Sequence, residues 1–218
     1  MSSYLEQTKD LLGDKLYLSK DISDIEAESN SSEVSSSLVE YSNQISDCEK
    51  CSLHSIRTNF VFGVGNPSAD IVFVGEAPGK QEDLLGEPFV GRAGKLLDKI
   101  IAAINLTRDD IYICNVLKCR PPDNRNPNTS EVEQCEPYLK TQLKIIEPKL
   151  IVALGRVAAK TLLKVDLPLG EMRKQSYSYE GIDAIVTYHP AALLRNPAFK
   201  RPCWEDFQKI RDNYLNKG

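Results

Sequence analysis

Residues 75–94 read GEAPGKQEDLLGEPFVGRAG, between an apolar run, IVFVG (71–75), and a run with helical spacing, KLLDKIIAAI (95–104). A glycine-rich turn between a strand and a helix is typical of a phosphate-binding loop, but this one lacks the GK[ST] ending. It carries four acidic residues instead: Glu76, Glu82, Asp83 and Glu87. Because carboxylates repel phosphate, the turn indicates a site where positive charge develops or where water is oriented.

The rest of the chain alternates between strand-like and helix-like segments. Four runs rich in β-branched residues are predicted strands: IVFVG (71–75), IYICNV (111–116), LIVALG (150–155) and AIVTY (184–188). Helical spacing covers roughly 92–105, 129–146, 156–164 and 203–215. This order predicts a three-layer α/β/α sandwich around a central four-stranded, mainly parallel sheet. Thr129 or Ser130 is expected to cap the second helix, and Gly155 to form the turn into the third. Ligands of such folds bind beyond the carboxyl ends of the strands.

The charge of the chain is unevenly distributed. The net charge of −4 includes a leader, residues 1–46, with three lysines and nine acidic residues. Residues 47–218 hold the remaining 24 Lys/Arg and 22 Asp/Glu, a net charge of +2. The second part can therefore present a basic face to nucleic acid, although the overall charge is negative.

The leader itself differs in composition from the rest. Residues 20–40 are serine-rich, acidic and poor in large apolar side chains, which predicts a flexible linker. Before them, 4–18 could form a short amphipathic helix, either as a poorly ordered tail or as a peptide that binds an unidentified partner protein. The chain has no apolar run of membrane-spanning length, and the acidic, polar residues MSSYLEQTKD at its start are not what is expected of a signal peptide. We expect a cytoplasmic monomer with no membrane association.

Four of the six cysteines form two pairs: Cys48 with Cys51, and Cys119 with Cys135. The first pair is a CxxC, and fifteen residues separate the second. Structural disulfides are rare in cytosolic proteins, whereas one tight pair and one spread pair can close a four-thiolate metal site. The spacing leaves zinc and an iron–sulfur cluster as alternatives. Cys114 and Cys203 are expected to be core residues.

Three further residues stand near predicted strand ends. Asn115 ends the second strand, and its amide offers a donor and an acceptor that can read the edge of a nucleobase. His189 follows the fourth strand and precedes a proline, so the backbone places it to donate into the site. Phe89 lies in the glycine-rich turn, where a core position is the alternative.

Taken together, GEAPGKQEDLLGEPFVGRAG, CNVLKCRPPDNRNP, HPAALLRNP and the four-cysteine spacing closely resemble the family 4 uracil-DNA glycosylases, the iron–sulfur type. The resemblance covers roughly residues 45–215. It implies a uracil-DNA glycosylase-like fold and a catalytic domain over 47–218. It also implies an enzyme that flips uracil out of single- or double-stranded DNA and hydrolyses its N-glycosidic bond, leaving an abasic site. A 4Fe–4S cluster would be bound by Cys48, Cys51, Cys119 and Cys135.

The resemblance also implies roles for individual residues. Phe89 would stack on the flipped uracil, Asn115 would hydrogen-bond its polar edge, and His189 would stabilise the charge that develops on the departing base. The turn at Gly75, Glu76 and Ala77 would contact the base.

One position departs from the wider superfamily. An Asp or Asn often handles the water in this turn, where Ala77 offers only a methyl group. A neighbouring carboxylate must then take that role, and we expect Glu82 to do so with assistance from Glu76.

Contacts with DNA are expected from the loop LLRNPAFKR (193–201). Leu193 and Leu194 would enter the vacated base stack, while three cations would hold phosphates: Arg195, Lys200 and Arg201. Lys118, Arg120 and Arg125 are expected to form a second basic edge.

Three other functions compete with this one. A non-catalytic iron–sulfur DNA-binding module would need none of the glutamates. A related type that traps its product covalently carries a histidine-containing insertion, and the loop RPPDNRNPNTSEVEQ (120–134) contains no histidine. A zinc-bearing nucleotide hydrolase would need a His/Asp metal cluster at the strand ends.

Overall fold

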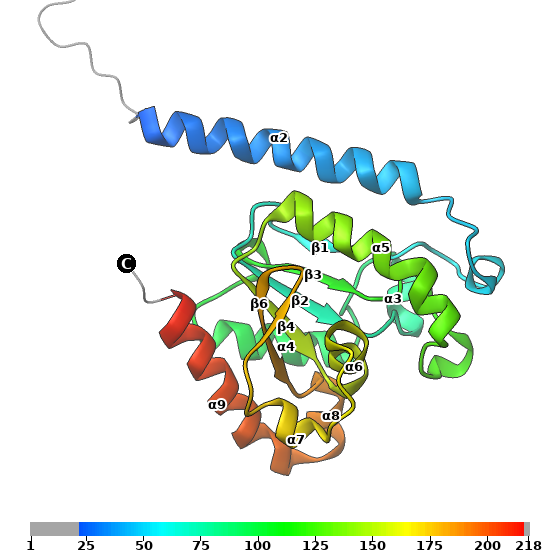
Figure 1. The fold of residues 1–218 in the computed structure, drawn as a ribbon, viewed down its shortest axis with the longest axis vertical. Coiled ribbons are helices and arrows are strands. Elements are labelled where there is room, and N and C mark those ends of the chain that lie inside the picture. Colours follow the sequence, from blue (N-terminus) through cyan, green and yellow to red (C-terminus); the bar gives the residue numbers. More distant parts are fainter. Residues whose placement is uncertain (1–21, 216–218) are drawn as a thin grey trace, which may run out of the picture. The chain divides into compact units, whose positions relative to one another are not determined.

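Six strands form one sheet in the order β1-β3-β2-β4-β6-β5 (Figure 1). This computed structural model describes residues 22–215, with side chains from residue 33 onward. The four inner strands are parallel: β3 (Tyr112–Asn115), β2 (Ile71–Gly75), β4 (Leu150–Leu154) and β6 (Ile182–Thr187). The two edge strands, β1 (Val64–Gly65) and β5 (Tyr177–Tyr179), pair antiparallel with their neighbours.

The four predicted strands are the four parallel ones, so the mainly parallel sheet is confirmed. Every residue of β2, β3 and β4 is buried, because helices cover both faces and leave no place for polar side chains. The predicted number of strands was wrong, since the sheet has six. The two edge strands span only two and three residues and are mostly half-buried, so neither has an apolar run that marks it in the sequence.

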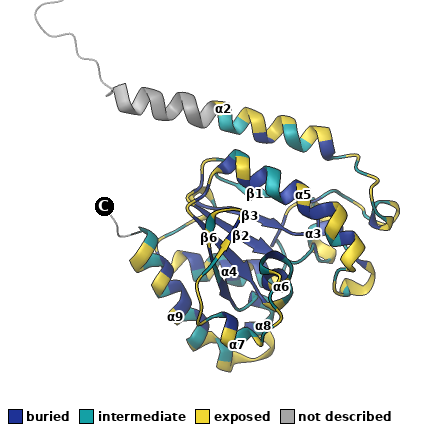
Figure 2. Cartoon of the chain, in the orientation of Figure 1, coloured by how far each residue is buried: buried dark blue, intermediate teal, exposed yellow. Residues whose placement is uncertain are grey.

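Helices pack on both faces of the sheet (Figures 1 and 2). One face packs against α4 (Arg92–Ala102), α8 (Pro190–Arg195) and α9 (Lys200–Ile210), and the other against α5 (Thr129–Ile146) and α6 (Arg156–Leu163). The three-layer sandwich is therefore confirmed. Two shorter helices are α3 (Lys80–Leu85) and α7 (Leu169–Met172). 3₁₀ turns occur at Ser52–Ser55, Arg108–Asp110, Pro122–Asn124 and Pro197–Phe199, and a π-helical turn at Arg211–Leu215 follows α9.

Two of the predicted helix starts can be compared with the structure. Gly155 does form the turn into α6, with φ of 91°, a conformation that favours glycine. The predicted cap of α5 was wrong by one residue, because Asn128 rather than Thr129 or Ser130 is the N-cap. Asn128 and Glu131 form a reciprocal capping box, and the Glu131 carboxylate accepts the Asn128 N–H at 2.8 Å.

The predicted boundary of the leader is also corrected. Helix α2 spans Ile22–Ile45, so most of the predicted linker over 20–40 is helical. Residues from Val34 onward belong to the large compact unit, where Leu38 and Ile45 are buried. These isolated apolar residues bring this part of the chain into the domain, despite its serine-rich composition. The helix expected over 4–18 lies outside the described residues.

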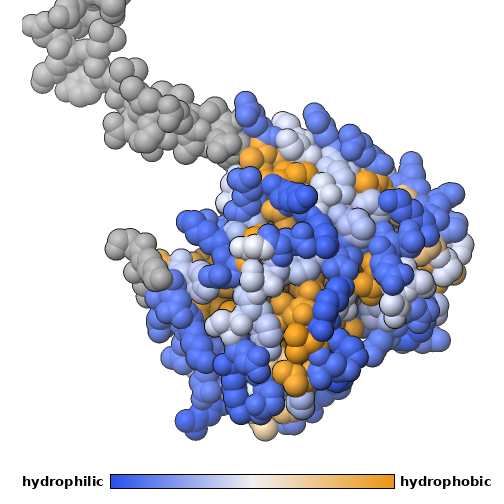
Figure 3. Space-filling model, in the orientation of Figure 1, coloured by the Kyte–Doolittle hydropathy of each residue, from blue (hydrophilic) through white to orange (hydrophobic). Residues whose placement is uncertain are grey.

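The surface on the side seen in Figure 3 is mainly hydrophilic, and the apolar side chains that reach it lie among charged and polar ones. Within residues 22–215, no helix is both long enough and apolar enough to cross a membrane.

The parallel strands end together at one edge of the sheet. Gly75 pairs with Asn115 across β2 and β3, and Leu154 pairs with Thr187 across β4 and β6. The chain enters the parallel sheet at β2, adds β3 on one side, and then adds β4 on the other. The crevice between the ends of β2 and β4 is therefore a topological switch point, where ligands of doubly wound sheets bind.

Candidate active site

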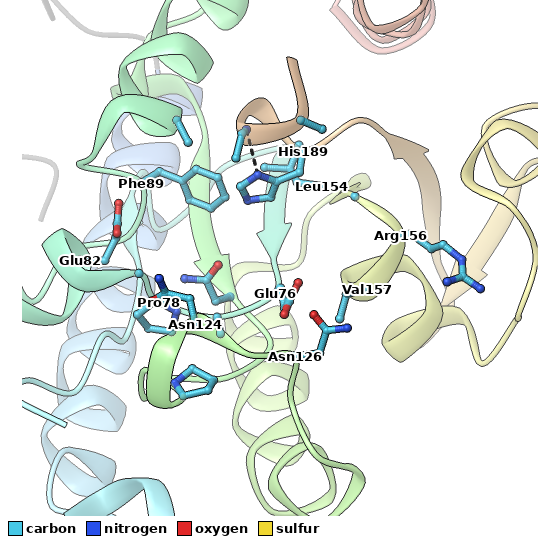
Figure 4. A pocket seen from close by; sticks show the side chains of 18 of the residues that line it. Glu76, Pro78, Glu82, Phe89, Asn124, Asn126, Leu154, Arg156, Val157 and His189 are labelled. Atoms are coloured by element: carbon cyan, nitrogen blue, oxygen red, sulfur yellow. Dashed lines mark hydrogen bonds between the residues drawn. The ribbon is translucent and has the colours of Figure 1, made fainter. Parts of the chain in front are cut away.

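A cavity of about 670 Å³ opens at this edge of the sheet (Figure 4). Its wall comes from the turn after β2, the end of β3, the turn after β4, and the segment after β6. All but Gly75 of the residues expected to act on or contact the base line it, and Arg195 does so as well: Glu76, Ala77, Glu82, Phe89, Asn115, His189 and Arg195. The fold thus brings together residues that lie more than a hundred positions apart in the sequence.

His189 is the N-cap of α8, and this position fixes its tautomer. Its Nδ1 accepts a hydrogen bond from the backbone N–H of Ala191 at 3.1 Å, drawn as the dashed line in Figure 4. In the neutral ring the proton must then be on Nε2, which can donate. Burial, followed by the positive charge of Arg195, lowers the pKa of His189 to about 4. The imidazole is therefore a neutral hydrogen-bond donor at pH 7.

Phe89 lies next to His189 in the wall of the cavity, with ring centroids 5.4 Å apart (Figure 4). Only 5% of it is exposed, and its φ is +55°, which is unusual for a bulky residue. The Arg108 side chain donates to the carbonyl oxygens of Pro88 and Phe89 and pairs with Asp98 at 2.7 Å. Sequence reasoning did not identify Arg108, although it holds the strained turn that presents the ring.

Asn115 and Phe89 both pack against the backbone of Gly75. A Cβ at Gly75 would lie 2.3 Å from Asn115 Oδ1 and 2.8 Å from two carbons of the Phe89 ring. Gly75 therefore supports the cavity from behind rather than lining it, and no other residue fits there. Ala77 lines the cavity and also packs against the cluster of buried residues that includes Cys119 and Cys135.

The two glutamates differ in their contacts. Glu82 Oε1 accepts the backbone N–H groups of Val90 and Gly91 at 3.0 and 2.9 Å. Glu82 thus ties α3 to the turn that follows Phe89, in addition to lining the cavity. Among the described contacts, no hydrogen bond involves the Glu76 carboxylate, and burial raises its pKa above the usual range. Both oxygens of Glu76 are therefore free in the cavity, whereas one oxygen of Glu82 is held by the Val90 and Gly91 N–H groups.

A loop over 121–126 forms a further wall that sequence reasoning missed. Asn124 and Asn126 line the cavity, and Asn126 lies beside Glu76 in Figure 4. Arg120 Nε donates to Asn124 Oδ1 at 2.8 Å, and Arg125 makes two hydrogen bonds to the Glu131 carboxylate at 2.9 and 2.6 Å. The asparagines in RPPDNRNP were the available signal, but only the fold brings this loop to the cavity.

The residues expected to bind DNA are mostly exposed. Leu194 is 49% exposed, and Arg195, Lys200 and Arg201 are exposed as well. Leu193 is only 2% exposed and packs in the core, so its expected part in the wedge was wrong.

The expected second basic edge also needs correction at Lys118, which is fully buried. Its Nζ donates to the Asn115 carbonyl oxygen at 2.9 Å and to Gln142 Oε1. Lys118 therefore supports the strand end from inside the domain and is inaccessible to DNA.

Four cysteines gather in one apolar cluster with Leu53, Leu117 and Tyr138: Cys48, Cys51, Cys119 and Cys135. The other two, Cys114 and Cys203, are buried in the cores on opposite faces of the sheet, as expected. The CxxC pair and the pair with fifteen intervening residues thus lie in one cluster. In the chain, the two pairs are separated by about seventy residues.

Three of these sulfurs accept hydrogen bonds. Arg57 Nη1 donates to Cys119 Sγ at 3.3 Å, the Lys118 N–H to Cys135 Sγ at 3.3 Å, and the Tyr138 hydroxyl to Cys48 Sγ at 3.1 Å. Such donors suit negatively charged thiolate sulfur. Within the described part of the chain, no group of three or more His, Cys, Asp or Glu converges closely enough to hold one metal ion. A polynuclear cluster has less need of such convergence, because each cysteine binds a different iron.

Comparison with known proteins assigns the class. The family model described as the uracil DNA glycosylase superfamily matches residues 62–208, which include the residues that line the cavity and all six strands of the sheet.

Individual relatives narrow this assignment. A type-4 uracil-DNA glycosylase of Archaeoglobus fulgidus is 50% identical over 77% of this chain and 88% of the relative. Those of Sulfurisphaera tokodaii and Saccharolobus solfataricus are 47% and 43% identical, over 81% and 80% of this chain and 84% and 85% of the relatives. The chain therefore belongs to the uracil-DNA glycosylase superfamily, and within it to the type-4 family.

Proposed function

We propose that this protein removes uracil from DNA by hydrolysing the N-glycosidic bond, releasing free uracil and leaving an abasic site. One observation carries the proposal: a neutral His189, with its proton on Nε2, stands in the same cavity as Phe89 and Asn115. A base that enters would meet a ring to stack on, an amide that reads its edge, and a donor for the charge that develops on it. The type-4 relatives carry the name of this activity.

Breaking the bond separates charge, and the cavity has groups for both signs. Negative charge grows on the departing base, where the His189 N–H can stabilise it. Positive charge grows on the sugar, where the carboxylates of Glu76 and Glu82 favour it. Since Glu76 has free oxygens, we assign to it the orientation of the attacking water, and to Glu82 the placement of the Phe89 turn together with part of the negative field.

The base must leave the helix to reach this cavity. Flipping costs a few kcal/mol, and the cost is lowest in a single strand or at a mismatch. We propose that Leu194 enters the vacated stack while Arg195, Lys200 and Arg201 bind phosphates. Arg195 both borders the cavity and is exposed, so it is placed to contact the nucleotide that is extruded.

We propose that the four clustered cysteines bind a 4Fe–4S cluster. This proposal is supported by the apolar surroundings that the four cysteines share and by the three hydrogen bonds to their sulfur atoms. The cluster would supply a structural crosslink between the segment at residues 48–51 and helix α5, next to the loop at 121–126. Chemistry at the base would remain with the side chains of the cavity.

Three other expectations remain proposals. Action in the cytoplasm is proposed because the chain belongs to a family of DNA-repair glycosylases. The protein is proposed to be a monomer, with one cavity on each molecule. Gel filtration at low concentration tests this oligomeric state. A partner protein for the leader remains to be sought with residues 1–33 as bait.

The activity is tested with an oligonucleotide that contains a single uracil. We expect free uracil in the supernatant and a strand that breaks at one position after alkali treatment. The same oligonucleotide with thymine should stay intact. Tight binding without any released uracil would instead support the non-catalytic DNA-binding module.

The metal centre is tested by composition. Anaerobically purified protein should be brown and contain about four irons per chain. Cys119→Ser should lose iron and visible absorption, because it leaves only three of the four clustered cysteines as ligands. Cys203→Ser, a buried cysteine on the other side of the domain, is the control and should keep both. Stoichiometric zinc without visible absorption would refute the cluster.

Base selection is expected to depend on Asn115. Uracil and cytosine differ in the order of donors and acceptors on their pairing edge, so Asn115→Asp should weaken uracil excision by about 1–3 kcal/mol in transition-state free energy. It should also raise excision of cytosine relative to uracil. Single-turnover rates on matched uracil and cytosine oligonucleotides measure both effects. Unchanged uracil kinetics would remove Asn115 from base recognition.

A further inference from the structure

The segment that carries His189 leaves the sheet after β6, and its two ends are joined by a stack of two aromatic rings. The chain passes from β6 through His189 and α8 to the 3₁₀ turn that ends at Phe199. The rings of Tyr188 and Phe199 stack at 4.6 Å with an interplanar angle of 16°. These two residues are the first and last of the segment 188–199. The stack therefore closes the base of a loop that carries both His189 and the exposed Leu194.

A buried ion pair holds this stack from behind. The Arg173 guanidinium lies 4.7 Å from the centre of the Tyr188 ring. Its Nε and Nη2 donate to the two oxygens of Asp206 at 2.7 and 2.9 Å, and the two side chains are only 13% and 5% exposed. Such a two-point contact fixes the plane of the guanidinium, and so the surface on which the tyrosine ring rests.

The same carboxylate reaches the end of β6. Asp206 Oδ2 accepts the Thr187 hydroxyl at 2.7 Å, and Thr187 is fully buried. Helix α9 is therefore bonded to the chain two residues before His189. Arg173, Thr187, Tyr188, Phe199 and Asp206 are all absent from the lining of the 670 Å³ cavity, so they have no access to a bound base.

We propose that Arg173, Asp206, Tyr188 and Phe199 form a positioning device, here named the loop clasp, which holds His189 in place when DNA contacts loop 190–198. The inference rests on the proposed glycosylase function. The physical reason is that both ends of the loop are fixed at one point. A force that DNA exerts at Leu194 or Arg195 is then met by a rigid base rather than by displacement of the imidazole. A buried ion pair contributes little net stability, so holding a geometry is the better explanation for keeping one here.

The clasp is tested by removing one ring at a time. Tyr188→Leu and Phe199→Leu should each slow single-turnover uracil release by about 3- to 10-fold. This factor corresponds to the interaction free energy of one aromatic pair. The double variant should be no slower than the slower single variant, because either change alone abolishes the stack. Tyr188→Phe keeps the ring and should release uracil at the parental rate.

Tyr177→Leu is the matched control. Tyr177 is a half-buried tyrosine on β5 that packs on the opposite face of the sheet, away from the clasp. The Tyr177→Leu substitution should lower the midpoint temperature of thermal unfolding without changing the rate of uracil release. Affinity for uracil DNA, measured separately, should fall less than the rate does in the clasp variants.

A second measurement needs no activity. Amide hydrogen exchange over residues 189–199 of the free protein should be faster in Tyr188→Leu and unchanged in Tyr177→Leu. If parental protein releases no uracil, the proposed function fails while the exchange result still decides whether the clasp holds the loop. The proposal would be overturned if the rate losses of Tyr188→Leu and Phe199→Leu multiplied in the double variant, or if both single variants cleaved at the parental rate. Unchanged hydrogen exchange in Tyr188→Leu would also overturn it.

Discussion

Replacing His189 with alanine should slow single-turnover uracil release by about 10²–10³-fold, the loss expected for one donor to a developing anion. Affinity for uracil DNA should change little, because the interaction strengthens only as charge appears on the base. The measurement is single-turnover cleavage with the enzyme in excess, with binding measured separately. Arg201→Ala is a suitable control for charge and loop effects, since Arg201 is exposed and does not line the cavity. It should weaken binding and leave the cleavage rate nearly unchanged.

The pH dependence provides an independent check of this role. Because the pKa of His189 is lowered to about 4, the ring stays neutral from pH 8 down to about pH 5. The His189-dependent part of the rate should therefore show no step near pH 6.5, where an ordinary histidine titrates. For the same reason, unfolded protein binds a proton below pH 6.5 that folded protein does not, so His189 destabilises the fold as the pH falls from 6.5 towards 4. A step at pH 6.5 in wild type that is lost in His189→Ala would contradict the neutral-donor role.

Glu76→Gln should slow single-turnover release by about 10²-fold, the lower end of what a positioned general base contributes. The amide keeps the shape of the side chain but loses the charge and the ability to take a proton from water. Glu87→Gln is the matched control, because it makes the same change in the same turn at an exposed side chain outside the cavity. It should cleave at the parental rate.

Glu82 separates the two possible roles of a carboxylate here. Glu82→Gln keeps an oxygen that can accept the Val90 and Gly91 N–H groups, whereas Glu82→Ala loses it. If placement of the Phe89 turn is its main role, the glutamine variant should be much faster than the alanine variant. Equal loss in both, together with an unaffected Glu76→Gln, would return the water-orienting role to Glu82.

Much of this protein could be predicted because its informative residues are local in sequence. Runs of buried β-branched residues such as those at 71–75 and 150–154 identify central parallel strands, since a strand covered on both faces has no polar positions. Asn115 and His189 could be selected because ligand sites of such folds lie at the ends of these strands. The four cysteines were paired by spacing alone. Composition misled for residues 34–45, where Leu38 and Ile45 are too widely spaced to mark a packed helix.

What the tertiary structure decided is the set of interactions between distant segments. Whether Glu76 or Glu82 keeps both carboxylate oxygens free depends on where the N–H groups of Val90 and Gly91 lie in space. The tautomer of His189 depends on a hydrogen bond formed only when α8 begins at that residue. Lys118 reads as a surface cation in KCRPP, yet it is buried because β3 ends next to Gln142 of α5. Side-chain type and spacing therefore determine the elements and the candidate chemistry, while burial and partners, which set charge and orientation, arise only when the elements pack.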